Sequence, residues 1–146
     1  MATYGGLGTQ LQIAHPTTAF AIVSQVVEIN GPESEMGERE ITHLGSTGAR
    51  EFAPTICDNG EISGSLWFDP AQASHVSFQQ MVQKATTVAG SSDGSVPMKI
   101  VLPTTTKTFT FNGFVKRFAI TGLAIDGTVG ADWSVRISGS VTYPTT

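Results

Sequence analysis

Apolar and polar residues alternate most regularly in the segment 132–143, near the end of the chain. One parity of this segment is largely apolar and consists of Trp133, Val135, Ile137, Val141 and Tyr143. The other parity is polar and consists of Asp132, Ser134, Arg136, Ser138, Ser140 and Thr142. A period of two residues is that of a β-strand with one packed face and one face in water. The segment therefore predicts a strand that covers the core on one face only.

Less regular alternation predicts further strands over residues 9–13, 20–30, 61–68, 98–102 and 108–120. The parity of 108–120 is disturbed at Asn112-Gly113, which indicates a β-bulge at that point. The sequence Asp58-Asn59-Gly60 is typical of a turn that leads into the strand 61–68. Most of the chain is thus expected to form β-strands.

One α-helix is expected in the middle of the chain, over about residues 70–85. Asp69 is a good N-cap and Pro70 suits the first helical position, while His75 is expected on the helix surface. Apolar side chains then recur at helical spacing, at Phe78, Met81, Val82 and Ala85. Together the elements predict a single, mainly β domain over residues 1–146. It is expected to be an antiparallel β-sandwich, or a strongly curved sheet, with the helix packed against it.

The segment 31–54 lacks such a pattern and is expected to be a long loop between two strands. Connections inside compact domains usually span about 4–6 residues, and much longer ones tend to be functional or disordered. This segment is rich in charge and glycine, yet it contains the large apolar side chains Met36, Ile41, Leu44 and Phe52. A loop that cannot bury such side chains within its own domain predicts an interaction surface for a partner.

Residues 1–19 are expected to form a flexible N-terminal arm, because Gly5, Gly6 and Gly8 loosen it and Pro16 interrupts it. No signal peptide is visible in this segment. No apolar run approaches the roughly 18 residues that a membrane-spanning helix requires. We therefore expect no membrane span.

The chain is poor in charge: charged residues make up 14%, against about 25% in an average globular domain. This composition fits a surface that becomes an interface, and equally a neutral, Ser/Thr-rich β domain. The formal net charge is −4, and the only adjacent pair of cations is Lys116-Arg117. Because affinity for nucleic acid needs several clustered cations, attractive binding is not expected. A mildly acidic surface would instead let DNA slide past.

No catalytic, cofactor or metal site is expected. His15, His43 and His75 fit no zinc-binding spacing, and none accompanies a nucleophile motif. Cys57 is the only cysteine, which excludes a disulfide within the chain. Two function classes remain as alternatives to an assembly protein. One is a non-catalytic binding module with Trp67 as an exposed anchor, and the other is a small hydrolase, for which the residues are missing.

Six short motifs follow one another between Val23 and Gly139. They are Val26–Pro32, Glu40-Ile41-Thr42, Asp58–Gly64, Asp69-Pro70, Phe111–Phe118 and Val135–Gly139. Their order and spacing resemble the major tail-tube proteins of tailed bacteriophages, especially those with long non-contractile tails. No motif is specific alone, and Glu40 stands where the family more often has Asp.

The resemblance implies a tail-tube type β-sandwich flanked by a helix, without catalysis or cofactors. It implies six-membered rings of this chain that stack into a hollow tube for DNA, assembled in the host cytoplasm and found in the virion tail. Partners would include the tail tip or initiator, the tape-measure protein and the terminator. We expect no C-terminal immunoglobulin-like domain, which some relatives carry. The tube of a secretion system or a contractile tail has the same fold and stays an alternative.

Two sets of residues are expected to make the contacts of such a tube. Contacts between subunits or rings are expected from the segment 31–54, at Met36, Glu38, Arg39, Glu40, Ile41, Leu44, Arg50 and Phe52. In this hypothesis the apolar residues are buried on stacking and the charged residues set the register. The lumen is expected on one of two polar faces: Glu61, Ser63 and Ser65, or Ser134, Arg136, Ser138 and Ser140.

Overall fold

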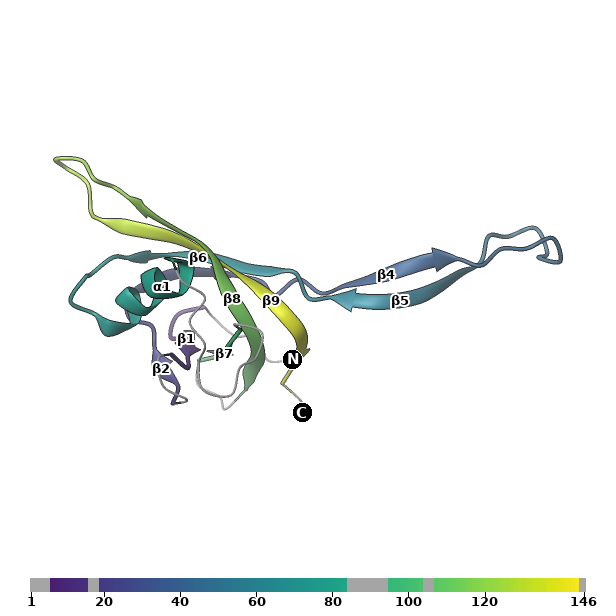
Figure 1. Ribbon diagram of the computed structural model, residues 1–146, viewed down its shortest axis with the longest axis horizontal. Coiled ribbons are helices and arrows are strands. Elements are labelled where there is room, and N and C mark those ends of the chain that lie inside the picture. Colours follow the sequence, from purple (N-terminus) through teal and green to yellow (C-terminus); the bar gives the residue numbers. More distant parts are fainter. Residues whose placement is uncertain (1–5, 16–18, 84–94, 104–106, 145–146) are drawn as a thin grey trace.

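The computed structural model describes residues 6–15, 19–83, 95–103 and 107–144. Its elements in chain order are β1 (Gln10–Ile13), β2 (Ala21–Ile22), β3 (Val26–Asn30), β4 (Glu35–Glu40), β5 (Phe52–Asp58), β6 (Glu61–Trp67), α1 (Ala73–Gln83), β7 (Val96–Val101), β8 (Thr108–Thr121) and β9 (Gly130–Thr142). Seven strands form one antiparallel sheet in the order β2-β1-β7-β8-β9-β6-β3, and β4 pairs with β5 alone. Figure 1 shows a curled body from which this separate hairpin projects.

The body is one strongly curved sheet that wraps around its core. Its two outermost strands, β2 and β3, are joined by only three residues, Val23–Gln25, so the sheet edges must approach each other. Hydrogen bonds from Val23 N to Leu11 O (2.9 Å) and from Trp67 N to Gln25 O (3.0 Å) hold this connection. The expected mainly β architecture with one packed helix is confirmed, in the form of a curved sheet.

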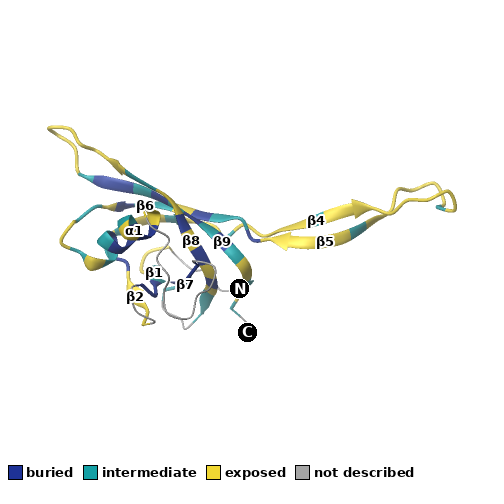
Figure 2. Cartoon of the chain, in the orientation of Figure 1, coloured by how far each residue is buried: buried dark blue, intermediate teal, exposed yellow. Residues whose placement is uncertain are grey.

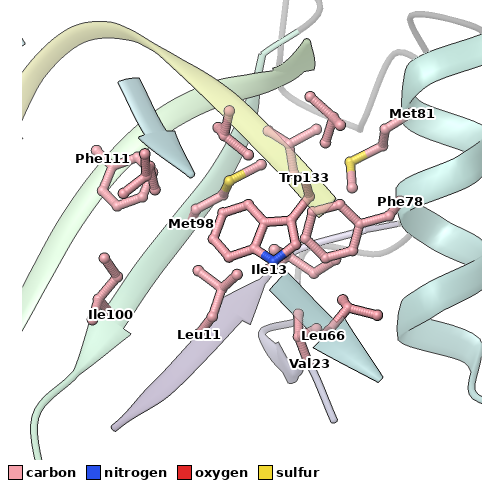
Figure 3. Packing of buried hydrophobic residues seen from close by; sticks show 14 of the residues in the cluster. Leu11, Ile13, Val23, Leu66, Phe78, Met81, Met98, Ile100, Phe111 and Trp133 are labelled. Carbon is pink, nitrogen blue, oxygen red and sulfur yellow. The ribbon is translucent and has the colours of Figure 1, made fainter. Parts of the chain in front are cut away.

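The core lies between the inner face of the sheet and α1. Trp133 of β9 is 1% exposed and stands at its centre, with Phe78 of α1 at a ring-centroid distance of 5.8 Å (Figure 3). Phe78 also stacks on Phe118 of β8 at 5.9 Å. The apolar parity predicted for 132–143 is buried at Trp133, Val135 and Ile137. Each such side chain contributes about 1.5–3 kcal/mol of transfer free energy before entropy costs.

The expected N-terminal arm is wrong for the residues that form β1. Leu11 and Ile13 are fully buried, because β1 pairs with β2 on one side and β7 on the other. Residues 1–5 and 16–18 of the expected arm lie outside the described residues. The short strand predicted over residues 9–13 is confirmed as β1, which begins one residue later, at Gln10.

The strand expected over 20–30 is divided. The backbone of Gln25 has a φ of 59°, in the left-handed region that breaks a strand, so β2 and β3 form separately. A register shift between Val26 and Glu28 follows, which leaves Val27 55% exposed instead of buried. Alternation alone cannot reveal a local change of face of this kind.

The helix begins later than expected, at Ala73. Asp69 Oδ1 accepts a hydrogen bond from Ala71 N at 2.9 Å, and Gln72 N donates to Asp69 O at 3.0 Å. These bonds make residues 69–72 a turn that precedes α1. The last predicted helical residues, 84 and 85, lie outside the described residues.

His75 is fully buried and does not lie on the helix surface as expected. Its Nδ1 accepts a hydrogen bond from Asp69 N at 2.9 Å, and its Nε2 lies 2.7 Å from Ser24 O. A neutral ring with the proton on Nε2 satisfies both contacts. His75 thereby connects the start of α1 to the turn between β2 and β3, which is a structural role.

The long strand 108–120 is confirmed, with slightly different ends. A register shift in its pairing with β9 lies between Thr110 and Asn112, as the disturbed parity predicted. A second shift, between Val115 and Arg117, was not predicted. The two irregularities keep Phe111, Val115 and Phe118 directed at the core along a strongly bent strand.

The largest correction concerns the segment 31–54, which is a β-hairpin and not a loop. β4 and β5 pair antiparallel, with Glu35 opposite Asp58 and Glu40 opposite Phe52. Both faces of this pair are exposed, so no alternation of buried and exposed side chains marks its strands. The register shift between Met36 and Glu38 further obscures the pattern.

Candidate functional site

The β4–β5 hairpin, which we call the arm and define as residues 33–58, is the most exposed part of the molecule. It extends away from the body, as Figure 1 shows. All its residues are exposed except Gly37, Ser46 and Ala53, which are half-buried (Figure 2). An isolated two-stranded hairpin is marginally stable in water at best. A segment of this kind is suited to packing against another surface.

The predicted apolar contact residues are all exposed on the arm. The exposed fractions are 56% for Met36, 44% for Ile41, 108% for Leu44 and 49% for Phe52. A fifth side chain, Ile56, is 83% exposed and was missed, because the predicted loop ended two residues before it. The strand pairing brings Ile56 into the arm, a position that depends on the hairpin register.

The tip of the arm, residues 41–51, has a defined shape. Ile41 N donates to Glu51 O at 2.9 Å, and Glu51 N donates to Thr42 Oγ1 at 2.8 Å. Ser46 N donates to His43 O at 2.9 Å and closes a turn that contains Leu44. Because these bonds lie within the tip, Leu44 is presented at the far end of the arm without any contact of its own.

The charged residues proposed to set the register are already partly paired inside the arm. Arg50 Nε and a terminal guanidinium nitrogen donate to the two carboxylate oxygens of Glu40, at 3.0 and 2.7 Å. This pairing lowers the pKa of Glu40 and raises the pKa of Arg50. Arg50 also lies 5.7 Å from the ring centroid of Phe52. Of the predicted charged set, Glu38 and Arg39 make no ion pair with the described residues.

The root of the arm is tied to the body by Asp58. Arg136 of β9 donates to its two carboxylate oxygens at 2.9 and 2.8 Å. Gly60 N donates to Asp58 Oδ1 at 2.8 Å, and this bond is the first cause that lowers the pKa of Asp58, followed by the hydrogen bond from Arg136. The neighbouring Asn59 is buried and donates to Gly139 O at 2.6 Å. The root is therefore held in one direction while the rest of the arm stays free.

The two polar faces considered for the lumen are one face. In the β6–β9 pairing Glu61 stands opposite Arg136 and Ser63 opposite Ser134, and directly paired residues share a side of the sheet. Ile62 and Val135 form the next pair and are fully buried on the other side. The remaining predicted residues, Ser65, Ser138 and Ser140, lie along the same two strands.

This polar face is not an acidic surface. Lys116 forms an ion pair with Glu61, and Arg136 pairs with Asp58. Arg117 lies opposite Ser134 and adds a further cation, while Glu28 and Asp132 both stand opposite Ser65 and add two carboxylates. The face therefore carries charges of both signs, and a strongly acidic lumen is not what this arrangement of charge would provide.

A second protruding tip was missed by the sequence patterns. Residues 122–129 connect β8 to β9 and extend beyond the body at the end opposite to the arm (Figure 1). Leu123 is 77% exposed and Ile125 is 103% exposed. Its sequence predicts an ordinary turn, because glycines are frequent in it and glycine is typical of turns. Trp67, the anchor of the alternative binding module, is 49% exposed near the base of this tip, where it packs beside Gly130.

Among the described residues, no three His, Cys, Asp or Glu side chains come together as a metal site would require. His15, His43 and His75 lie in different parts of the fold: after β1, at the tip of the arm and inside α1. Within the described ranges, no helix is long and apolar enough to cross a membrane.

A comparison with known protein families finds one that matches nearly the whole chain. The profile of the family described as "Phage tail tube, TTP, lambda-like" matches residues 4–145. No curated protein matches the chain.

Solved structures with the same fold come from tail-like particles. A chain in the cryo-EM structure of the anti-feeding prophage baseplate has a TM-score of 0.75 at 10% identity, over 98% of each chain. The tail of an empty gene transfer agent particle, refined with C6 symmetry, gives 0.72 at 14% identity over 98% of this chain and 100% of that one. The SPP1 tail tube gives 0.68 at 11% identity over 98% and 80%.

The family match spans nearly the whole chain, and the fold it implies is the fold observed. The chain belongs to the lambda-like phage tail tube proteins, a structural and non-enzymatic family whose place is the tail of the virion.

Proposed function

We propose that this protein forms stacked, hexameric rings that build the hollow tail tube through which DNA passes. The similar gene transfer agent tail was refined with C6 symmetry, and the similar baseplate was six-fold symmetrised. Heterologous contacts that do not close within one ring extend into an open filament, as a tube requires. Assembly takes place in the host cytoplasm, with the tail tip or initiator, the tape-measure protein and the terminator as partners.

The observation that carries this proposal is the arm. It exposes five large apolar side chains, at Met36, Ile41, Leu44, Phe52 and Ile56, on a hairpin with no core of its own. Such exposure favours burial against a second copy in a neighbouring ring. Each side chain that is buried there contributes about 1.5–3 kcal/mol before ordering costs.

The polar face of β6 and β9 is the face that we propose for the lumen. It combines Glu61, Ser63 and Ser65 with Ser134, Arg136, Ser138 and Ser140, and its ion pairs leave little net charge. A polar surface without clustered free cations lets a phosphate backbone pass without strong attraction.

A tube of a contractile or secretion-type system is the second candidate. The observation in its favour is the fold shared with the anti-feeding prophage baseplate chain. Its mechanism of assembly would be the same, and the arm would have the same role.

The test is a concentration series of the purified protein, followed by light scattering and negative-stain microscopy. We expect rings or hollow tubes from the natural chain. A variant in which Glu38–Pro54 is replaced by Asn-Gly keeps the paired root of the arm and should stay folded and monomeric. Val82→Ser, an exposed position on α1, is the matched control and should assemble normally.

Two results would count against this proposal. If the shortened variant forms tubes, the residues of the arm that it lacks are not needed for assembly. A natural chain that stays monomeric at every concentration, also with sheared tubes as seeds, would favour the binding-module alternative.

A further inference from the structure

Charge is distributed very unevenly between the arm and the body. Residues 33–58 contain six acidic side chains and two arginines, which amounts to −4. The rest of the chain contains six acidic and six basic side chains, which amounts to zero. The formal net charge of the whole chain, −4, is therefore the charge of the arm.

The ion pairs do not remove this imbalance. Arg50 is held by Glu40 within the arm, so it is not available to a neighbouring copy. At the root, Glu35 stands directly opposite Asp58, and like charges in this position repel each other. Arg136 reaches Asp58 from the body and relieves only that carboxylate.

Among the described residues of the body, few cations are left without a partner of their own for an incoming arm. Lys116 is paired with Glu61, and Lys99 lies 4.6 Å from the ring centroid of Phe20. Arg117 is exposed and makes no ion pair with the described residues, but a single guanidinium does not balance a charge of −4. Two copies that meet through their arms therefore bring like charge together while they bury apolar side chains.

We propose that mobile cations gate arm-mediated assembly, so that added salt strengthens the association of this protein. This inference rests on the proposed function, in which the arms make the contacts between copies. The repulsion acts between exposed charges and is screened when the Debye length falls from about 10 Å at 0.1 M salt to about 3 Å at 1 M. A contact that depends on complementary charge would respond in the opposite direction.

Such repulsion would let a chain with exposed apolar side chains stay dispersed while it is made. At low ionic strength the charge of the arm keeps copies apart, and the apolar side chains act only once screening or a preformed surface lowers the repulsion. No fixed ion site is required, because the effect comes from the summed charge of the arm.

The test compares two variants with the same total charge. Glu35→Gln with Glu38→Gln removes two charges from the arm, and Glu28→Gln with Asp126→Asn removes two from exposed positions on the body. The critical concentration for assembly is measured by light scattering between 0.05 and 0.5 M NaCl, with microscopy of the products. These salt concentrations span a Debye length from about 14 to about 4 Å.

We expect the critical concentration of the natural chain to fall as salt rises. The arm variant should assemble at about three- to tenfold lower concentration at low salt and should depend less on salt. The body variant should behave like the natural chain. Salt also strengthens the burial of apolar surface. The salt dependence that remains in the arm variant therefore measures this second effect.

Three results would overturn the inference. Tubes that form less readily as salt rises would show that complementary charge dominates, while the proposed tube function would still hold. If the body variant lowers the critical concentration as much as the arm variant does, the total charge of the chain and not the charge of the arm controls assembly. The absence of tubes from every variant at every salt concentration would remove the inference together with the proposed function.

Discussion

The body and the arm are both antiparallel β-structure, yet they are stabilised by different means. In the body, Trp133, Phe78 and Leu66 lie in a shared core and are almost fully buried. In the arm, paired backbone groups and the Glu40–Arg50 ion pair provide the internal contacts, and the apolar side chains face outward. The same secondary structure thus produces a self-contained fold in one region and an incomplete one in the other.

This difference separates stability from assembly. Changes in the core should alter the free energy of unfolding, and changes on the arm should alter association with little effect on unfolding. The four predictions below test this separation, from the largest expected effect to the smallest.

The largest effect is expected for Phe78→Ala in α1. Phe78 is fully buried and contacts Trp133 and Phe118, so its removal leaves a cavity at the centre of the core. We expect a loss of about 3–5 kcal/mol in the free energy of unfolding, measured by denaturant titration. Loss of less than about 1 kcal/mol would mean that α1 is not an integral part of the body. Val82→Ser on the exposed side of the same helix is the control.

Gly64→Ala should also destabilise the body. An added Cβ at Gly64 would lie 2.0 Å from Glu28 O and 2.8 Å from the indole ring of Trp133. We expect a loss of about 1–3 kcal/mol through displacement of β3, the strand that leads into the arm. Gly48→Ala provides a comparison confined to the arm. The Cβ added there has no atom within 4 Å, so only the backbone φ of 83° strains the variant. Equal unfolding midpoints for Gly64→Ala and the natural chain would contradict the close packing of β3 on β6.

Leu44→Ser should leave unfolding unchanged and weaken assembly. Leu44 is fully exposed in the free chain, and its burial in a contact would contribute about 1.5–3 kcal/mol. The critical concentration should then rise by roughly 10- to 100-fold, as seen by light scattering. Leu123→Ser on the opposite tip is the comparison, because it shows whether that tip takes part as well. An unchanged critical concentration for Leu44→Ser would contradict a role for the tip of the arm.

The smallest effect is expected for Asp58→Asn at the root of the arm. Gly60 N and Arg136 lower the pKa of Asp58, so this interaction stabilises the folded chain above the ordinary carboxyl pKa of about 3.9. The contribution is lost as the pH falls through the lowered pKa. At pH 7 we expect the variant to expose the arm to trypsin about two- to fivefold faster, at Arg39 and Arg50. Equal cleavage rates for the two chains at pH 7 would show that the root does not depend on this carboxylate.

The strands of the body could be predicted where burial leaves a one-sided pattern. The segment 132–143 is the clearest case, since alternation identified its strand and its buried residues Trp133, Val135 and Ile137. The helix was also identified, from the apolar residues Phe78 and Met81 at helical spacing, and the bulge near Asn112 was identified from broken parity. In each case a local pattern records a contact with the core.

The arm could not be predicted as a hairpin, because its strands have no buried face to leave a pattern. Its role as an exposed, apolar-bearing segment was nevertheless readable from Met36, Ile41, Leu44 and Phe52. The burial of His75 depends on backbone groups at Asp69 and Ser24, and Ser24 lies 51 residues away from His75 in the chain, so no local pattern reports it. The two polar faces considered for the lumen lie on the same side of the sheet because of the register between β6 and β9. That register is a property of the folded sheet and leaves no local pattern in the sequence.

The exposed arm also makes it possible to distinguish free subunits from incorporated ones by hydrogen exchange. In a free chain its backbone hydrogen bonds are covered by no core and should exchange their amide hydrogens with solvent quickly. Packed against a neighbour, the same amides between Glu35 and Asp58 should exchange slowly, while those of β9 should hardly change. A short pulse of deuterium would therefore label each subunit according to whether it was free or incorporated at that moment. The fraction of subunits incorporated at each time could then be followed on the chain itself, without any attached probe.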